Sequence, residues 1–176
     1  QIRKISDQYM ETADKYGMIR DKLASAIRKA EQLGCEILFE TSGALSGCKE
    51  AVELIKSFSS ACLGVAWNIR NAYFEGGIDA ETGIQILGAY IRYVRIGDRS
   101  GSVNTLLGEG ELPVTSFLDA LHSLNYEGFV CACGNDEISD SDIILTHFRS
   151  FLTGLDSNTG HSELFYNRSK TGTFPW

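Results

Sequence analysis

Short apolar runs alternate with longer amphipathic stretches along most of the chain. Four of these runs have the length and composition of buried strands, namely 35–40, 61–67, 91–98 and 128–133. Around them, apolar residues recur at helical spacing, which predicts helices over 10–33, 46–58, 79–90, about 113–124 and 140–153. Apolar strands that alternate with amphipathic helices predict an α/β fold, with a parallel sheet covered by helices.

Residues typical of helix ends support this division. Gly34 is expected to end the first helix, and Asp79 to cap the third. Pro113 is expected to open the fourth helix, after a loop marked by Gly108 and Gly110. These two glycines lack the third glycine and the strand–turn context of a dinucleotide-binding fingerprint, so no nucleotide site is inferred there. The positions of the second helix that should face inward are Ala51, Leu54 and Ile55.

Four strand–helix units amount to half of a (β/α)8 barrel of the TIM type. A half barrel would expose two sheet edges, which invite pairing with other strands. Three arrangements stay open: a piece of a longer polypeptide, a homodimer of two half barrels, or an open doubly wound sheet. Residues 1–153 are assigned to the barrel segment. Residues 154–176 are rich in Gly, Ser, Thr and Asn, which predicts a linker or terminal extension.

Charge and hydropathy exclude several classes of partner. The net charge is −7, with acidic and basic residues interspersed, which argues against a nucleic-acid surface. No apolar run reaches the roughly 18 residues of a membrane span, and the first residues lack the apolar stretch of a secretory signal. The five cysteines mostly lie in apolar runs and show no C-x-x-C spacing. Buried free thiols in a reducing cytoplasm are therefore expected, and Cys131 and Cys133 are read as small apolar side chains on one face of a strand.

Three segments carry a resemblance to a known family. They are AEQLGCEILFE, LGVAWNIRNAYFEGGIDAETGIQILGAYIRYVRIGD and LGEGELPVTSFLDALHSLNYEGFVCAC. In this order and spacing, they resemble the C-terminal half of the xylose isomerase-like barrel family, which includes sugar-phosphate isomerases and epimerases. The resemblance implies a divalent metal such as Mn, Mg or Zn, held at the C-terminal ends of the strands by carboxylates and histidine.

The resemblance matches the family's metal site at Glu40, which stands where a metal-binding glutamate is expected. Arg95 stands in place of a histidine, and Asp98 is retained from the same segment. Asn68 and Asn71 stand where the family usually has aspartate and often has histidine.

The final glutamate of the family's site, a ligand and often a base, is replaced by Cys133. A hard divalent cation needs several charged oxygen ligands, and the permanent charge of Arg95 would repel it. We therefore expect no metal, and we hypothesise that the guanidinium of Arg95 occupies the metal's place and pairs with Glu40. On this hypothesis Glu40 is the candidate catalytic residue. The candidate ligand-binding residues are Arg95, Asn68, Asn71, Asp98 and Cys133.

Each candidate also has a purely structural alternative. Glu40 could form an ordinary salt bridge, and Arg95 could face solvent if the sheet is open. Asn68 and Asn71 could make turn hydrogen bonds, and Asp98 could stabilise the loop after its strand. Surface or helix-packing roles are expected for His122, His147 and His161.

Three functions follow from these readings. The first is a degenerate barrel that binds a small sugar or anionic ligand as a binding or regulatory module. The second is an active sugar or sugar-phosphate isomerase or epimerase. The third rests on the segment ELFYNRSKTGTFPW, which resembles the region preceding the adenylate-forming module of AMP-forming acyl-CoA ligases and implies the N-terminal region of a long-chain acyl-CoA ligase.

Overall fold

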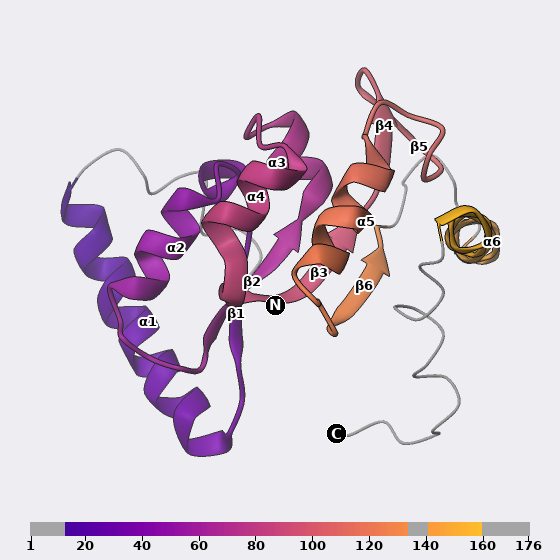
Figure 1. Ribbon diagram of the computed structural model, residues 1–176. Helices are drawn as coiled ribbons and strands as arrows, with labels where there is room; N and C mark the ends of the chain where they lie inside the picture. Colours follow the sequence, from indigo (N-terminus) through magenta and orange to yellow (C-terminus); the bar gives the residue numbers. More distant parts are fainter. Residues whose placement is uncertain (1–12, 134–140, 160–176) are drawn as a thin grey trace. The chain divides into compact units, whose positions relative to one another are not determined.

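The computed structural model describes residues 13–133 and 141–159 (Figure 1). These residues form two compact units. Within the described part, the first unit holds residues up to Arg95 together with Gly128–Val130. The second unit holds 96–127, 131–133 and the last helix. The boundary falls within two strands, between Arg95 and Ile96 and between Val130 and Cys131.

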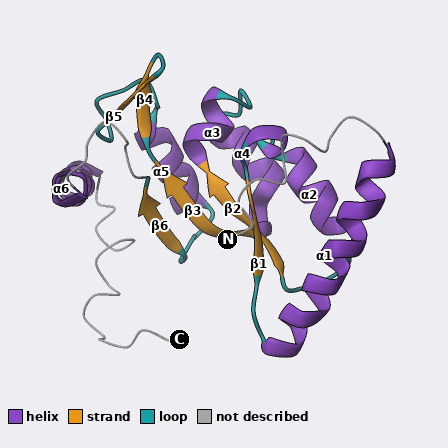
Figure 2. Ribbon diagram, turned by 180° about the vertical axis from the view of Figure 1, so that it is seen from behind, coloured by secondary structure: helices purple, strands orange, loops and turns teal. Residues whose placement is uncertain are grey.

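The four predicted strands and the five predicted helices occur in the predicted order, with an extra short helix after the second strand and a two-stranded hairpin after the third (Figure 2). Up to residue 96, the elements are α1 Ala13–Leu33, β1 Ile37–Glu40, α2 Lys49–Lys56, β2 Leu63–Asn68, α3 Ile69–Phe74, α4 Ala80–Leu87 and β3 Ile91–Ile96. After it come β4 Asp98–Ser100, β5 Val103–Thr105, α5 Val114–Ser123, β6 Phe129–Ala132 and α6 Ser141–Thr159. Two short 3-10 turns lie at Gly43–Leu45 and Gly88–Tyr90.

The main sheet has four strands in the order β1-β2-β3-β6, and β2 pairs in parallel with both β1 and β3. All six residues of β2 are buried, as expected for a central strand covered on both faces. In the described part the sheet does not close on itself, and β1 and β6 are its end strands. The prediction that 35–40 is a buried strand is therefore wrong in its burial, since Leu38 is 36% exposed.

A bulge in β3 decides which of its side chains share a face with β1 and β2. Val65 is opposite Ile91, but the next residue, Ala66, is opposite Tyr93, so Arg92 has no opposite residue. Side chains alternate along a strand, so the extra residue reverses the alternation. Arg95 thereby comes opposite Asn68.

The helix-facing core of the first unit is built around Trp67, whose side chain is fully buried. Gly83 of α4 lies directly against it, because a Cβ at this position would come 2.4 Å from the indole ring. The helix begins at Asp79, which accepts a 2.8 Å hydrogen bond from the backbone N–H of Thr82, as the sequence predicted. Hydrogen bonds from the backbone and the side chain of Thr82 lower the pKa of the Asp79 carboxyl.

Several predicted boundaries differ from the structure. The second helix begins at Lys49 and buries Val52 rather than Leu54, which is half-buried. The third strand ends at Ile96, because Asp98 starts a separate antiparallel hairpin of β4 and β5. The last helix continues past residue 153 to Thr159. Most of the predicted extension, residues 160–176, lies outside the described part of the chain.

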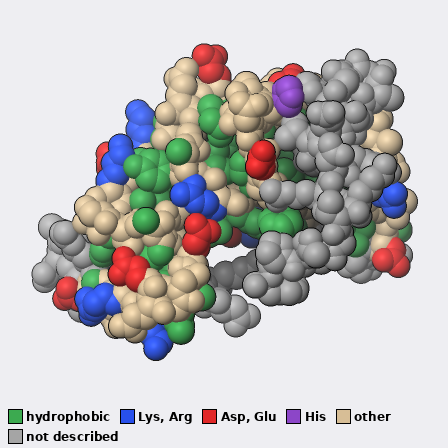
Figure 3. Space-filling model, turned by 60° about the horizontal axis from the view of Figure 1, so that its bottom comes forward, with side chains coloured by type: hydrophobic (Ala, Val, Ile, Leu, Met, Phe, Trp, Pro, Cys, Tyr) green, Lys and Arg blue, Asp and Glu red, His purple; other side chains and the backbone are tan. Residues whose placement is uncertain are grey.

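The surface carries both signs of charge, and acidic and basic side chains are interspersed on the face drawn in Figure 3. Among the described residues, no helix is long and apolar enough to cross a membrane.

The cysteines are free thiols, but the prediction that they are mostly buried is wrong. Cys35 and Cys131 are exposed, whereas Cys48 and Cys133 are buried. Cys35 lies before the end strand β1 and Cys131 lies within the end strand β6, and an end strand has only one neighbour to cover it. Burial, reinforced by the charge of nearby Glu50, raises the pKa of the Cys48 thiol to about 12.

We expect Cys48 to react with an alkylating reagent at neutral pH far more slowly than Cys35, because only the thiolate is nucleophilic. Peptide-level mass spectrometry after timed iodoacetamide treatment measures both rates in one sample. Treatment in denaturant serves as the control and should bring the two rates together. Equal rates in the folded protein would contradict the burial of Cys48.

Candidate functional site

Three polar side chains meet at the C-terminal ends of β1, β2 and β3. Nη1 of Arg95 donates to both carboxylate oxygens of Glu40, at 2.9 Å each. Nδ2 of Asn68 donates to Oε1 of the same carboxylate at 2.8 Å. The side chains of Arg95 and Glu40 remain 24% and 32% exposed, so solutes can reach the ion pair. The pairing of Arg95 with Glu40 that the sequence suggested is confirmed as a contact.

Thr41 holds this cluster together and was missed from the sequence. It is fully buried directly after β1, and its hydroxyl accepts a 2.9 Å hydrogen bond from the backbone N–H of Asn68. Its own N–H donates to the carbonyl of Ala66 at 3.2 Å, which continues the β1–β2 pairing past Glu40. Thr41 therefore fixes the end of β1 against the end of β2. Its position beside Glu40 was the only signal in the sequence.

Asn68 combines a structural role with its contact to Glu40. It is the N-cap of α3, where its Oδ1 accepts from the N–H of Asn71 at 3.2 Å. Asn71 is therefore a helix residue, and its side-chain oxygen lies 3.5 Å from Nε of Arg70. The turn-type hydrogen bonding considered for these asparagines is thus observed, but at a helix N-terminus.

The donor set at this end of the sheet does not fit a hard divalent cation. Both oxygens of Glu40 are engaged by Arg95, and the amide oxygen of Asn68 caps α3. The nearest charge besides the carboxylate is a guanidinium, which repels a cation. Among the described residues, no group of three or more His, Cys, Asp or Glu side chains is placed to hold a metal.

Asp98, the retained acidic residue, is an anchor for a loop. It is 1% exposed, and its carboxylate accepts four backbone hydrogen bonds of 2.8–3.0 Å. The donors are the N–H groups of Arg99, Gly108, Gly110 and Leu112. The structural alternative considered for Asp98 is therefore observed, and its oxygens are already engaged.

The two glycines of this loop are required by close contacts. Gly108 has a φ of +86°, and a Cβ there would come 2.1 Å from the ring of Phe151 on α6. A Cβ at Gly110 would come 2.3 Å from Oδ1 of Asp98. The Gly-x-Gly pattern thus serves to bind the Asp98 carboxylate and to pack against α6, in agreement with the prediction that it is not a nucleotide site.

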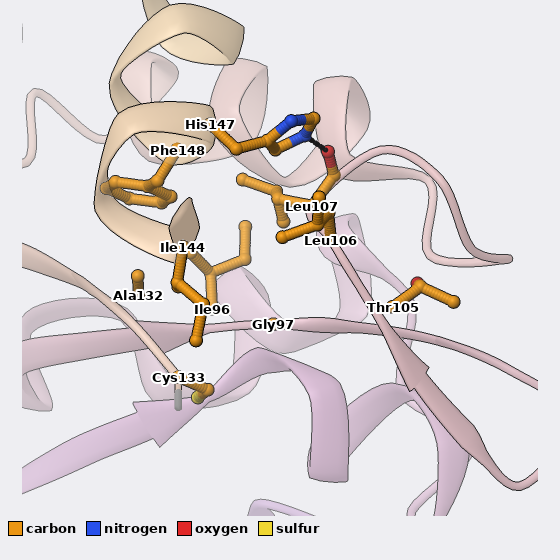
Figure 4. A pocket seen from close by; sticks show the side chains of 10 residues that line it. All are labelled: Ile96, Gly97, Thr105, Leu106, Leu107, Ala132, Cys133, Ile144, His147 and Phe148. Atoms are coloured by element: carbon orange, nitrogen blue, oxygen red, sulfur yellow. Dashed lines mark hydrogen bonds between the residues drawn. The ribbon is translucent and has the colours of Figure 1, made fainter. Parts of the chain in front are cut away.

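Cys133 belongs to the second unit, where it lines a small cavity beneath α6 (Figure 4). Most of the lining is apolar, and it includes Ile96, Leu107 and Phe148. A ring nitrogen of His147 lies 2.9 Å from the carbonyl oxygen of Leu107, which is the helix-packing role expected for this histidine. The structure thus unites Glu40, Asn68 and Arg95 in the first unit, whereas Asp98 and Cys133 belong to the second.

Comparison with known proteins identifies the fold. The profile of a family described as "Xylose isomerase-like TIM barrel" matches residues 5–150. No match was found among curated proteins.

Solved structures with the same fold are remote in sequence. An L-ribulose 3-epimerase has a TM-score of 0.70 and 20% identity, with 91% of this chain and 60% of that one covered. For a xylose isomerase domain protein from Planctomyces limnophilus the TM-score is 0.68 and the identity 17%, with 85% and 55% covered. The probable 3-DHS dehydratase AsbF from Bacillus anthracis has a TM-score of 0.72 and 13% identity, with 82% of this chain and 58% of that one covered. This chain thus spans somewhat more than half the length of these proteins.

Proposed function

The chain belongs to the xylose isomerase-like TIM barrel family, and on that premise we propose that it is a degenerate member. In this proposal its ion pair stands where relatives hold a metal. The module binds a small sugar or anionic ligand without metal-assisted isomerisation, and it acts in binding or regulation.

One observation supports the proposal above all others: Arg95 contacts both oxygens of Glu40 at 2.9 Å, at the C-terminal ends of the strands. In TIM barrels this end of the strands carries the functional groups. A carboxylate that is fully engaged by a guanidinium is a poor metal ligand.

The same three side chains suit hydroxyl groups and anions. A ligand hydroxyl can donate to Glu40 and accept from Asn68 or Arg95, because the cluster presents acceptors and donors side by side. A phosphate or carboxylate can instead pair with Arg95, in exchange for Glu40. The second mode requires the guanidinium, and the first can use it.

The test combines metal analysis with binding by two variants. We expect the purified chain to hold less than stoichiometric Mn, Mg or Zn, and to bind D-tagatose or inorganic phosphate in calorimetry. Arg95→Ala should weaken that binding by about 10- to 100-fold, the loss of one charge-assisted hydrogen bond of about 1.5–3 kcal/mol.

Arg92→Ala is the matched control, because Arg92 lies on the same strand and pairs with Glu36 at a more exposed position. It should leave the affinity unchanged. Equal losses in both variants, or no binding of either probe by the parent chain, would refute a ligand site at Arg95.

An active isomerase or epimerase is the second candidate. Retention of a part-exposed glutamate at the end of β1 favours it, as does the number of epimerases among the similar structures. Stoichiometric metal together with ketose turnover that Glu40→Gln abolishes would establish it. The third candidate, the N-terminal region of an AMP-forming acyl-CoA ligase, rests on residues outside the described part of the chain. The sequence of the full-length transcript tests it, because an adenylate-forming module should then follow.

A further inference from the structure

We propose that the site at Glu40 and Arg95 binds α-hydroxy carboxylates, the class of molecule that includes sugar acids such as aldonates. This inference rests on the proposed function, because it names the ligand class of the same site. An α-hydroxy carboxylate carries a carboxylate and a hydroxyl on neighbouring carbons, and the site offers a charged partner for each of the two groups.

The guanidinium of Arg95 is the group that would hold the ligand carboxylate. Both of its hydrogen bonds to Glu40 come from one nitrogen, Nη1, at 2.9 Å each. The strongest arginine–carboxylate pairs instead use two nitrogens in parallel. Because 24% of the Arg95 side chain is exposed, a ligand carboxylate that adopts the two-nitrogen geometry can compete with Glu40 for the guanidinium.

The displaced carboxylate of Glu40 decides which anions fit. It would lie close to the anionic group of the ligand, and two negative charges at such short range disfavour each other. Asn68 donates one hydrogen bond of 2.8 Å to Oε1, so Oε2 needs a new donor once Arg95 has moved. A hydroxyl on the carbon next to the ligand carboxylate can supply that hydrogen bond, whereas a simple carboxylate has no donor.

Two other ligand classes satisfy only part of the site. A neutral sugar offers hydroxyls, but its hydrogen bonds to Arg95 lack a second charge and are weaker. A phosphate monoester carries a charge of about −1.5 to −2 at pH 7, more than the single charge of a carboxylate, and adds more repulsion from Glu40. The α-hydroxy carboxylate is therefore the favoured class.

Another ion pair of the first unit provides a matched control. Nε of Arg92 pairs with Glu36 at 3.2 Å, where the two side chains are 38% and 51% exposed. Arg92 also donates to the backbone carbonyls of Ala89 and Ile91, which hold its guanidinium in place. Glu36 thus has the same kind of partner as Glu40 but lies outside the candidate site.

The first test is calorimetry on the unmodified chain with three matched probes. They are D-gluconate, 2-deoxy-D-gluconate, which lacks the hydroxyl beside the carboxylate, and D-sorbitol, which lacks the carboxylate. We expect D-gluconate to bind at least about tenfold more tightly than either of the others, because each of them lacks one charge-assisted hydrogen bond.

The variant Glu40→Ala then tests the role of the displaced carboxylate. Without Glu40 the ligand no longer competes for Arg95, so 2-deoxy-D-gluconate should bind about two- to fivefold more tightly, the worth of a part-exposed ion pair. The preference for D-gluconate over 2-deoxy-D-gluconate should disappear, because the acceptor for the hydroxyl is gone. Glu36→Ala should keep both affinities of the parent chain.

Equal affinities of the parent chain for D-gluconate and 2-deoxy-D-gluconate would overturn the inference, and so would a Glu40→Ala variant that keeps the tenfold preference. Binding of D-tagatose or phosphate alongside either result would leave the proposed function standing. If the parent chain binds none of these probes, both the inference and the proposed function fail. The comparison of probes on the parent chain stands even if a variant folds poorly, because it needs no substitution.

Discussion

Asp98→Ala should destabilise the protein by about 3–5 kcal/mol. The carboxylate accepts hydrogen bonds from four backbone N–H groups and is 1% exposed. Each buried donor that loses its acceptor costs about 1–3 kcal/mol, and the more exposed donors lose less because water replaces the carboxylate. Urea unfolding followed by circular dichroism measures the loss.

Glu111→Ala is the matched control for this prediction. Glu111 also accepts two hydrogen bonds from the hairpin, from Oγ of Ser100 and the N–H of Gly101, but it does so at the surface. Its removal should cost less than about 1 kcal/mol, since water can take its place. Asp98→Asn should fall between the two variants, because it keeps one acceptor oxygen. Equal losses for Asp98→Ala and Glu111→Ala would show that the buried carboxylate does not organise the loop.

The anchoring role of Asp98 also shows how far the sequence can be interpreted. Its position at the end of a predicted apolar strand was enough to suggest that it stabilises the following loop. The donors were not predictable, because Gly108 and Leu112 lie ten and fourteen residues away and meet the carboxylate only through the β4–β5 hairpin. That hairpin consists of two three-residue strands, too short to give a periodic pattern.

The contact between Arg95 and Glu40 was predicted by the resemblance to the family, whereas the local pattern of IRYVRI did not contain it. Simple alternation would place Ile91, Tyr93 and Arg95 on one face of the strand. The buried residues are instead Ile91, Val94 and Ile96. The alternation shifts after Ile91 because the bulge at Arg92 inserts one residue. Such a change depends on the register with β2, which no property of the β3 sequence alone determines.

Burial at the ends of the sheet was the other systematic error. Residues 35–40 and 128–133 have the apolar composition of central strands, yet Leu38 and Phe129 are exposed. The composition of a strand indicates what its side chains are suited to contact. It does not show whether a neighbouring strand is present to bury them. The predicted core was correct for β2, whose two neighbours lie within this chain.

The combined change Arg95→His and Asn68→Asp should give the site a measurable affinity for Mn²⁺ or Zn²⁺. It removes a positive charge and adds a carboxylate next to Glu40, to which Asn68 already donates at 2.8 Å. Two unit charges about 4 Å apart interact by about 4 kcal/mol at an effective dielectric constant of about 20, and partial exposure reduces this value. We therefore expect at least about a tenfold gain in affinity over the parent chain, measured by calorimetry with each metal.

The two substitutions are expected to preserve the local fold, since aspartate is as good an N-cap for α3 as asparagine. Arg92→His with Asn68→Asp is the matched control: it leaves the guanidinium of Arg95 beside Glu40 and should bind no metal more tightly than the parent. If the control gains as much affinity as the Arg95 variant, the charge of Arg95 is not what opposes a cation. If neither gains, the carboxylates are too few even without that charge, and the loss of the family's other ligand positions, including the one at Cys133, is the dominant cause. Only a gain confined to the Arg95 variant agrees with a guanidinium that has taken the place of a metal ion.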